Sequence, residues 1–132
     1  MLQRVFLAGI LVCLFVPLAA ADYGNLPLAF ERNIGQTHDS VDFLARSHGY
    51  TVLLSRREAV FSMRNDGAKR SMVRMRLTGV RDSSAPAEGV DSLAGKSHYL
   101  IGTDVSKWHR DVPQYRAVKY TGIYPDIDVI YY

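Results

Sequence analysis

Short runs in which apolar and polar residues alternate recur along most of the chain, and this period of two predicts β-strands. The clearest run is 72–77 (MVRMRL), with Val73, Met75 and Leu77 on one face and Arg74 and Arg76 on the other. We expect this strand to have one buried and one solvated face, as in many antiparallel sheets. Two more strands are predicted at 50–55 and 59–63, with apolar faces formed by Tyr50, Val52, Leu54 and by Ala59, Phe61, Met63.

The segment 41–46 (VDFLAR) fits two elements. Val41, Phe43 and Ala45 alternate as in a half-buried strand, whereas Val41, Leu44, Ala45 and His48 would share one face of a short helix. The strand is favoured because Gly49 and another strand follow at once, so that Ser47-His48-Gly49 would close a β-hairpin. Asn65-Asp66-Gly67 predicts a second tight turn, since these residue types tolerate positive φ.

The C-terminal stretch 95–132 holds the only tryptophan and six of the eight tyrosines. After a polar loop at 81–89, the pattern predicts a short strand at 97–101, a turn region at 102–107, a strand at 114–120 after Pro113, a turn at 121–126 and a last strand at 127–132. That last strand is apolar on both faces, so it should be central or covered, although at the chain end it would leave an exposed edge. Strand signals about every ten residues indicate an all-β fold, either an antiparallel β-sandwich-like domain or an open barrel.

Residues 1–21 have the pattern of a secretory signal peptide. Arg4 supplies the positive start, residues 5–20 are an uncharged apolar run that is expected to be helical, and Ala19-Ala20-Ala21 offers small residues for cleavage. The alternative is an uncleaved anchor, but the apolar run is shorter than the ~20 residues that a spanning helix needs. We therefore expect a domain at 22–132 that is secreted or displayed at the cell surface, with no stable membrane span after cleavage.

Cysteine content and net charge limit how the domain folds and what it binds. Cys13, the only cysteine, leaves with the signal peptide, so the exported domain must fold on its core without disulfides. The formal net charge is +3, and removal of Arg4 leaves +2. This balance does not indicate nucleic acid or a polybasic membrane patch.

No motif for bond-breaking chemistry is present, and we expect no catalytic residues, no cofactor and no metal. The histidines have no close metal-ligand spacing, and there is no Gly-x-Ser-x-Gly elbow or phosphate loop. Asp126 and Asp128 could bind calcium together with Asp104 or Asp111, but a turn cap at Asp126 and a structural pairing of Asp128 with an arginine or backbone donors are favoured. Paired carboxylates for glycoside cleavage are not indicated. Several aromatic residues could line a sugar-binding surface, although core packing is favoured for them: Tyr99, Trp108, Tyr115, Tyr120, Tyr124, Tyr131 and Tyr132.

A series of short motifs carries a family resemblance. They are Phe30-Glu31-x-Asn33-x-Gly35-Gln36-Thr37, Val41-x-Phe43-Leu44-Ala45-Arg46-x-x-Gly49-Tyr50-Thr51, Glu58-Ala59-Val60, Met75-Arg76-Leu77, Gly89, Gly95-Lys96-Ser97-x-Tyr99, Ile101-Gly102, Trp108, Val112-Pro113-x-Tyr115, Val118-x-Tyr120 and Tyr124-Pro125-x-Ile127-Asp128. In this order they resemble the domain of unknown function found at the N-terminus of secreted bacterial proteins with SBBP-type (seven-bladed β-propeller) repeats. His98 and Asp126 depart from it, standing where Asn and Gly are usual.

The resemblance implies an exported β-domain with no established activity, often ahead of a propeller. It also implies that this chain is a truncated version, because relatives continue past the final tyrosine pair. We expect a non-catalytic structural or interaction module; the sequence does not identify its partner, and other surface proteins and carbohydrate are both candidates. The alternatives are a carbohydrate-binding module that uses exposed aromatics and, remotely, a hydrolase fragment.

Overall fold

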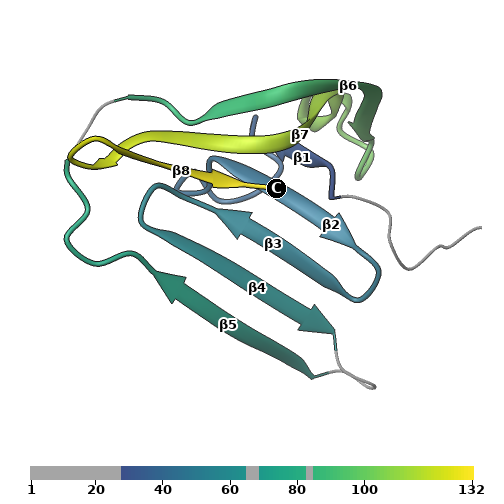
Figure 1. Ribbon diagram of the computed structural model, residues 1–132. Coiled ribbons are helices and arrows are strands. Elements are labelled where there is room, and N and C mark those ends of the chain that lie inside the picture. Colours follow the sequence, from purple (N-terminus) through teal and green to yellow (C-terminus); the bar gives the residue numbers. More distant parts are fainter. Residues whose placement is uncertain (1–27, 65–68, 83–84) are drawn as a thin grey trace, which may run out of the picture.

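The structure is a computed structural model that describes residues 28–64, 69–82 and 85–132 (Figure 1). The predicted signal peptide, the first residues of the domain and the Asn65-Asp66-Gly67 turn lie outside these ranges. Within them, no helix is long and apolar enough to cross a membrane.

In the described residues, eight antiparallel strands form one sheet. In chain order they are β1 (Phe30–Arg32), β2 (Phe43–Ser47), β3 (Tyr50–Leu54), β4 (Glu58–Arg64), β5 (Arg70–Arg76), β6 (Glu88–Tyr99), β7 (His109–Tyr124) and β8 (Ile127–Tyr131), with a 3₁₀ turn, η2 (Val105–Lys107), before β7. The order in the sheet is β5-β4-β3-β2-β1-β7-β6, and β8 also pairs with β7. The all-β, antiparallel prediction is confirmed, and the segment from Phe43 is a strand rather than a helix.

The first half of the sheet is a meander, and its first turn follows the predicted signal. Ser47 pairs with Tyr50 across the two-residue turn at His48-Gly49. Gly49 has a φ of +87°, a conformation that a side chain would disfavour. The register places Val52 opposite Ala45 and Phe61, so the apolar faces of β2, β3 and β4 coincide.

β7 joins the two halves because it pairs with three strands. β6 lies along one edge of β7, while β1 and β8 follow one another along the other edge, with Phe30 opposite Tyr115 and Tyr131 opposite Val118. Figure 1 shows the sheet curling, so that β7 and β8 lie over one face of β2 and β3. The core fills the space inside this curl: Phe30, Phe43, Ala45, Val52, Leu54, Ala59, Val80, Ala87, Val118, Tyr120 and Ile123.

β5 corrects one prediction. The face of Val73 and Met75 was expected to be buried, but these side chains are 54% and 43% exposed, and every residue of β5 is exposed. β5 is the outermost strand of the sheet. Val129 and Tyr131 of β8 pack against the core cluster, most of whose buried residues come from inner strands, and no residue of β5 belongs to that cluster. Alternation therefore identified the strand correctly and its burial wrongly.

β6 and β7 are longer than predicted. β6 begins at Glu88, inside the expected polar loop. Gly89 makes room for a ring rather than forming a loop, since a Cβ there would lie 2.5 Å from ring atoms of Tyr115. Pro113 lies within β7 rather than before it. It is tolerated where the pairing of β1 with β7 ends at Gln114 and the β6 register shifts between Ser92 and Lys96.

β8 is an outer strand rather than a central one, and it is covered only in part, where Val129 and Tyr131 pack against the core. Ile127 and Ile130 are 52% and 51% exposed, and among the described residues only β7 pairs with this strand. The turn that leads into β8 is Pro125-Asp126, between the paired residues Tyr124 and Ile127. Asp126 has a φ of +58°, which explains why glycine would suit this position.

The side chain of Asn33 organises the loop between β1 and β2. Its amide nitrogen donates to the carbonyl oxygens of His38 at 2.9 Å and Val41 at 2.8 Å. Its amide oxygen accepts from the backbone N–H groups of Gly35 at 3.1 Å and Thr37 at 3.3 Å. Asn33 thus acts as an internal cap that fixes Thr37 beside the outer face of the sheet.

Candidate functional site

A hollow of about 790 Å³ lies on the outer face of β2–β5, opposite the core. The alternation of the strands directs Leu44, Leu53 and Ser62 to this face, away from Val52 and Phe61. We call it the basic groove and define it by its lining residues: Thr37, Leu44, Arg46, Ser47, His48, Gly49, Tyr50, Thr51, Leu53, Ser62, Arg64 and Arg70.

Three arginines give the basic groove its charge. Arg64 at the end of β4 stands directly opposite Arg70 at the start of β5, and Arg46 comes from β2. All three are exposed, no carboxylate lines the groove, and none of the three forms an ion pair with another described residue. Like charges directly opposite each other in a sheet are destabilising, so the Arg64–Arg70 pair favours an anion between them.

A partly buried hydrogen-bond network holds Arg46 in place. Its guanidinium lies over the Tyr99 ring at 4.8 Å and donates a hydrogen bond to the Tyr99 hydroxyl. That hydroxyl in turn donates to the carboxylate of Glu31, which is buried and also accepts from Ser97. Burial, followed by the nearby Glu31 carboxylate, raises the pKa of Tyr99 to about 12. The phenol therefore stays neutral and keeps its role as a donor to Glu31.

The chemistry of the groove suits binding rather than bond cleavage. Guanidinium groups form paired, charge-assisted hydrogen bonds with carboxylates, and hydroxyl groups at Thr37, Thr51 and Ser62 can donate further hydrogen bonds. The volume is within the range of small-molecule sites, but those sites are mostly apolar and enclosed. A polar, open lining is a better match to acidic groups carried by a larger partner.

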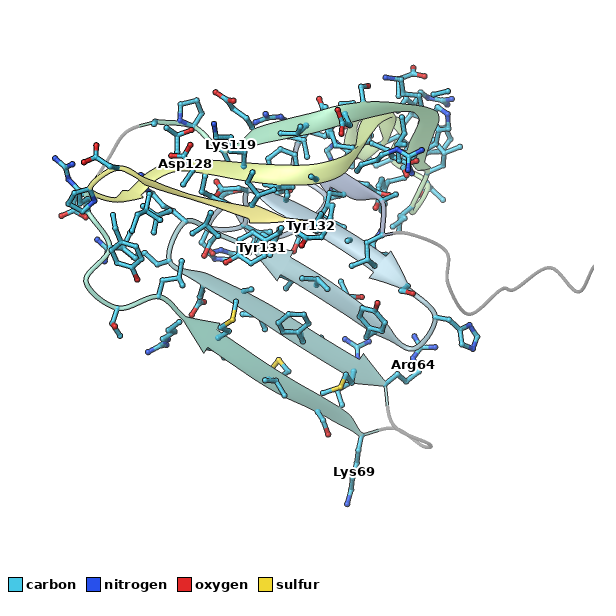
Figure 2. The ribbon with its side chains drawn as sticks, in the orientation of Figure 1. Arg64, Lys69, Lys119, Asp128, Tyr131 and Tyr132 are labelled. Atoms are coloured by element: carbon cyan, nitrogen blue, oxygen red, sulfur yellow. The ribbon has the colours of Figure 1, made fainter. Side chains whose placement is uncertain are left out.

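Figure 2 shows Arg64 at the end of β4 and Lys69 extending from the sheet just before β5. The positive charge of this end of the molecule therefore continues beyond the groove. At the other end of β4, Glu58 balances part of the positive charge of β5, since it binds Arg74 at 2.8 Å and Arg76 at 3.2 Å. These two hydrogen bonds and charges lower the pKa of Glu58 despite its partial burial.

A second hollow, of about 430 Å³, lies beside Glu58 and Arg76. Carboxylates do not converge in it. Glu58 is the one acidic residue among its lining residues, and it is already bound to two arginines. A glycosidase needs two carboxyl groups that flank the scissile bond. This hollow therefore gives no support to the hydrolase alternative.

The described residues that were weighed for metal binding do not form an ion-binding cluster. Among the described residues no group of three or more His, Cys, Asp or Glu side chains could hold an ion. Asp128 is used structurally, as predicted: it accepts from the Gly122 N–H at 2.8 Å and pairs with Lys119 at 2.9 Å. The Lys119–Asp128 pair joins β7 and β8, and Figure 2 shows these residues side by side. The backbone donor and Lys119 both lower the pKa of Asp128.

The aromatic residues weighed for sugar binding are mostly packed. Tyr120 is fully buried, and Trp108 is half-buried, with its indole N–H donating to the Gly102 carbonyl at 3.1 Å. Tyr132, at 93%, is the exposed member of the set. The described residues therefore present no exposed row of aromatic rings, and the packing interpretation is favoured.

The basic groove is the feature that sequence reasoning missed. Arg46, Arg64 and Arg70 come from three strands, and Arg74 and Arg76 were the arginines that stood out in the pattern. One signal was available: Arg64 and Arg70 flank the predicted Asn65-Asp66-Gly67 turn, so a hairpin there would place them opposite each other.

The comparisons with known proteins add one finding. A family model described as Domain of unknown function (DUF7948) matches residues 30–132, from the first strand to the last residue. No curated protein matches the chain, and no solved structure matches it either.

Proposed function

The chain belongs to the DUF7948 family, and from that premise we propose that it is a non-catalytic interaction module of an exported protein that binds acidic segments of a protein partner. The observation that carries this proposal is the basic groove: three exposed arginines, no lining carboxylate and no ion pair to any described residue. In a larger surface protein, such a domain would serve as a docking unit ahead of a β-propeller.

A polypeptide partner is favoured over a polysaccharide. Sugar-binding surfaces commonly stack rings on exposed aromatic side chains, and the described aromatics are packed except for Tyr132. Acidic side chains, by contrast, need only the guanidinium and hydroxyl groups that line the groove.

The binding test uses a fluorescently labelled decaglutamate peptide and the purified protein at low salt. Replacement of both Arg64 and Arg70 by Ala should weaken binding at least about tenfold, because it removes two charge-assisted contacts. The control replaces Arg81 and Arg116 by Ala. These arginines are exposed and lie outside the groove, so this variant has the same net charge.

Two outcomes would contradict the proposal. Equal weakening in both double variants would show that only overall charge matters. Tighter binding of polygalacturonate than of decaglutamate, lost in the groove variant, would favour the carbohydrate-binding alternative instead.

Export is proposed from the signal-peptide pattern of residues 1–21. Expression of the full chain in a bacterial host should release a product that begins at Asp22. N-terminal sequencing of the protein in the periplasm or medium tests this expectation. Recovery of the intact chain in the cytoplasm alone would overturn it.

A further inference from the structure

The free edge of β5 is the second unusual surface of the molecule. β4 pairs with β5 over seven residue pairs, from Glu58–Arg76 to Arg64–Arg70, and no other described strand pairs with β5. Unpaired edges invite another strand, and proteins often protect them with charged side chains. Figure 1 shows β5 as the outermost strand of the meander, with its outer side clear of the other labelled strands.

The pattern of hydrogen bonds identifies which backbone groups face outward. The Leu77 N–H donates to the Arg57 carbonyl at 2.9 Å, next to the Glu58–Arg76 pair. Hydrogen-bonded and non-hydrogen-bonded pairs alternate along an antiparallel ladder. Residues 71, 73 and 75 therefore bond to β4, whereas Arg70, Met72, Arg74 and Arg76 direct their N–H and C=O groups to the free edge.

The side chains of β5 give its two faces different chemistry. Val73 and Met75 lie on the core side of the sheet, where Val73 is paired with Phe61. The side chains of Val73 and Met75 are each more than 40% exposed. Arg70, Arg74 and Arg76 lie on the other side, which continues into the basic groove through Arg70. Glu58 is the carboxylate that binds Arg74 and Arg76, so positive charge remains in excess on this face.

These features select a particular partner. A second β5 edge would place arginines beside arginines, and like charges in neighbouring strands are destabilising. A strand that alternates acidic and apolar residues would place carboxylates beside the arginines and apolar side chains beside Val73 and Met75. Met72, 68% exposed on the arginine face, adds an apolar contact between the charges.

We propose that β5 accepts an extended segment of a partner protein as an added strand, with acidic residues on one face and apolar residues on the other. The backbone groups of Met72 and Arg74 bind the segment, and the arginines select its charge. This inference rests on the proposed function and makes it more specific, because Arg70 belongs both to the basic groove and to β5.

The test compares two probes by fluorescence anisotropy: an alternating Val-Glu peptide, which matches both faces of β5, and decaglutamate, which carries the charge without the alternating apolar residues. Met72→Pro removes an N–H that faces the free edge and leaves the bonds to β4 intact. It should weaken Val-Glu binding about tenfold and change decaglutamate binding less than about twofold. Met72→Thr keeps the N–H but loses the apolar contact, so it should bind the Val-Glu peptide more tightly than Met72→Pro does and bind decaglutamate equally well.

The outcomes separate the two proposals. Equal Val-Glu affinity in Met72→Pro and Met72→Thr overturns strand addition, while loss of decaglutamate binding in the Arg64/Arg70 variant still supports the groove. If circular dichroism shows that Met72→Pro does not fold, amide hydrogen exchange of the native protein decides. Slower exchange at Met72 and Arg74 on addition of the Val-Glu peptide supports the inference, and unchanged exchange overturns it.

Discussion

Tyr120 and Tyr131 pack edge to face in the core, with ring centroids 6.0 Å apart and planes at 88°. Their hydroxyl groups differ. The Tyr120 hydroxyl donates to the Asp42 carboxylate at 3.1 Å, whereas the buried Tyr131 hydroxyl has no hydrogen-bond partner among the described residues. Burial raises the pKa of both phenols, and for Tyr120 the Asp42 charge adds to this effect. The two rings are thus a matched pair in which one hydroxyl stabilises the fold and the other does not.

Replacement of each tyrosine by phenylalanine separates these roles. Tyr120→Phe should lower the free energy of unfolding by about 2 kcal/mol, because it breaks a charge-assisted hydrogen bond. Tyr131→Phe should raise the free energy of unfolding by about 1 kcal/mol, because it removes a desolvated hydroxyl and keeps the ring contact. Urea unfolding followed by circular dichroism measures both, and equal losses in the two variants would contradict this account.

At the scale of the element, the sequence predicts the meander β2–β5 well and the pair β6–β7 poorly. The meander depends on local information: alternation within each strand and turn residues such as Gly49 between them. β6 depends on distant information, since Gly89 is required by the ring of Tyr115, which comes 26 positions later. In a sequence, a glycine that makes room for a ring cannot be told from a glycine in a loop.

Burial and the basic groove were hard to predict for a related reason. The exposure of Val73 and Met75 depends on the order of strands in the sheet, which alternation does not contain. The groove needs the register of three strands, and only the Arg64–Arg70 part of it could be inferred from one turn. The family resemblance gave the order of the motifs along the chain, but it did not indicate which residues lie next to each other in the fold.

At the scale of the whole molecule, several groups with raised pKa values lie at the contacts that close the curled sheet. Burial and Glu31 raise the pKa of Tyr99 to about 12, where β6 meets β1 and β2. Tyr120 and Tyr131 hold β7 and β8 over the core. Asp128 raises the pKa of Lys119 at the β7–β8 hairpin. The curl thus depends on neutral phenols and on a charged lysine, and the described residues contain no cysteine that could reinforce it.

This arrangement predicts a fold that fails at alkaline pH. For each tyrosine the folded pKa lies above the unfolded value near 10, so the stabilising contribution is complete below pH 10 and is lost as the pH rises through the folded pKa, about 12 for Tyr99. Lys119 changes in the same direction, because its folded pKa is also raised. We expect the free energy of unfolding to fall between about pH 10 and 12, with tyrosinate absorbance at 295 nm rising together with the loss of circular dichroism.

Two variants make this alkaline prediction specific. Tyr99→Phe should show a smaller fall in the free energy of unfolding between pH 8 and pH 11.5, because one phenol no longer ionises preferentially in the unfolded chain. Tyr132→Phe should behave like the native protein, since Tyr132 is 93% exposed. Tyrosinate absorbance that rises fully near pH 10 while circular dichroism stays unchanged would show that the phenols ionise freely in the folded state, and the curl would then not depend on keeping them neutral.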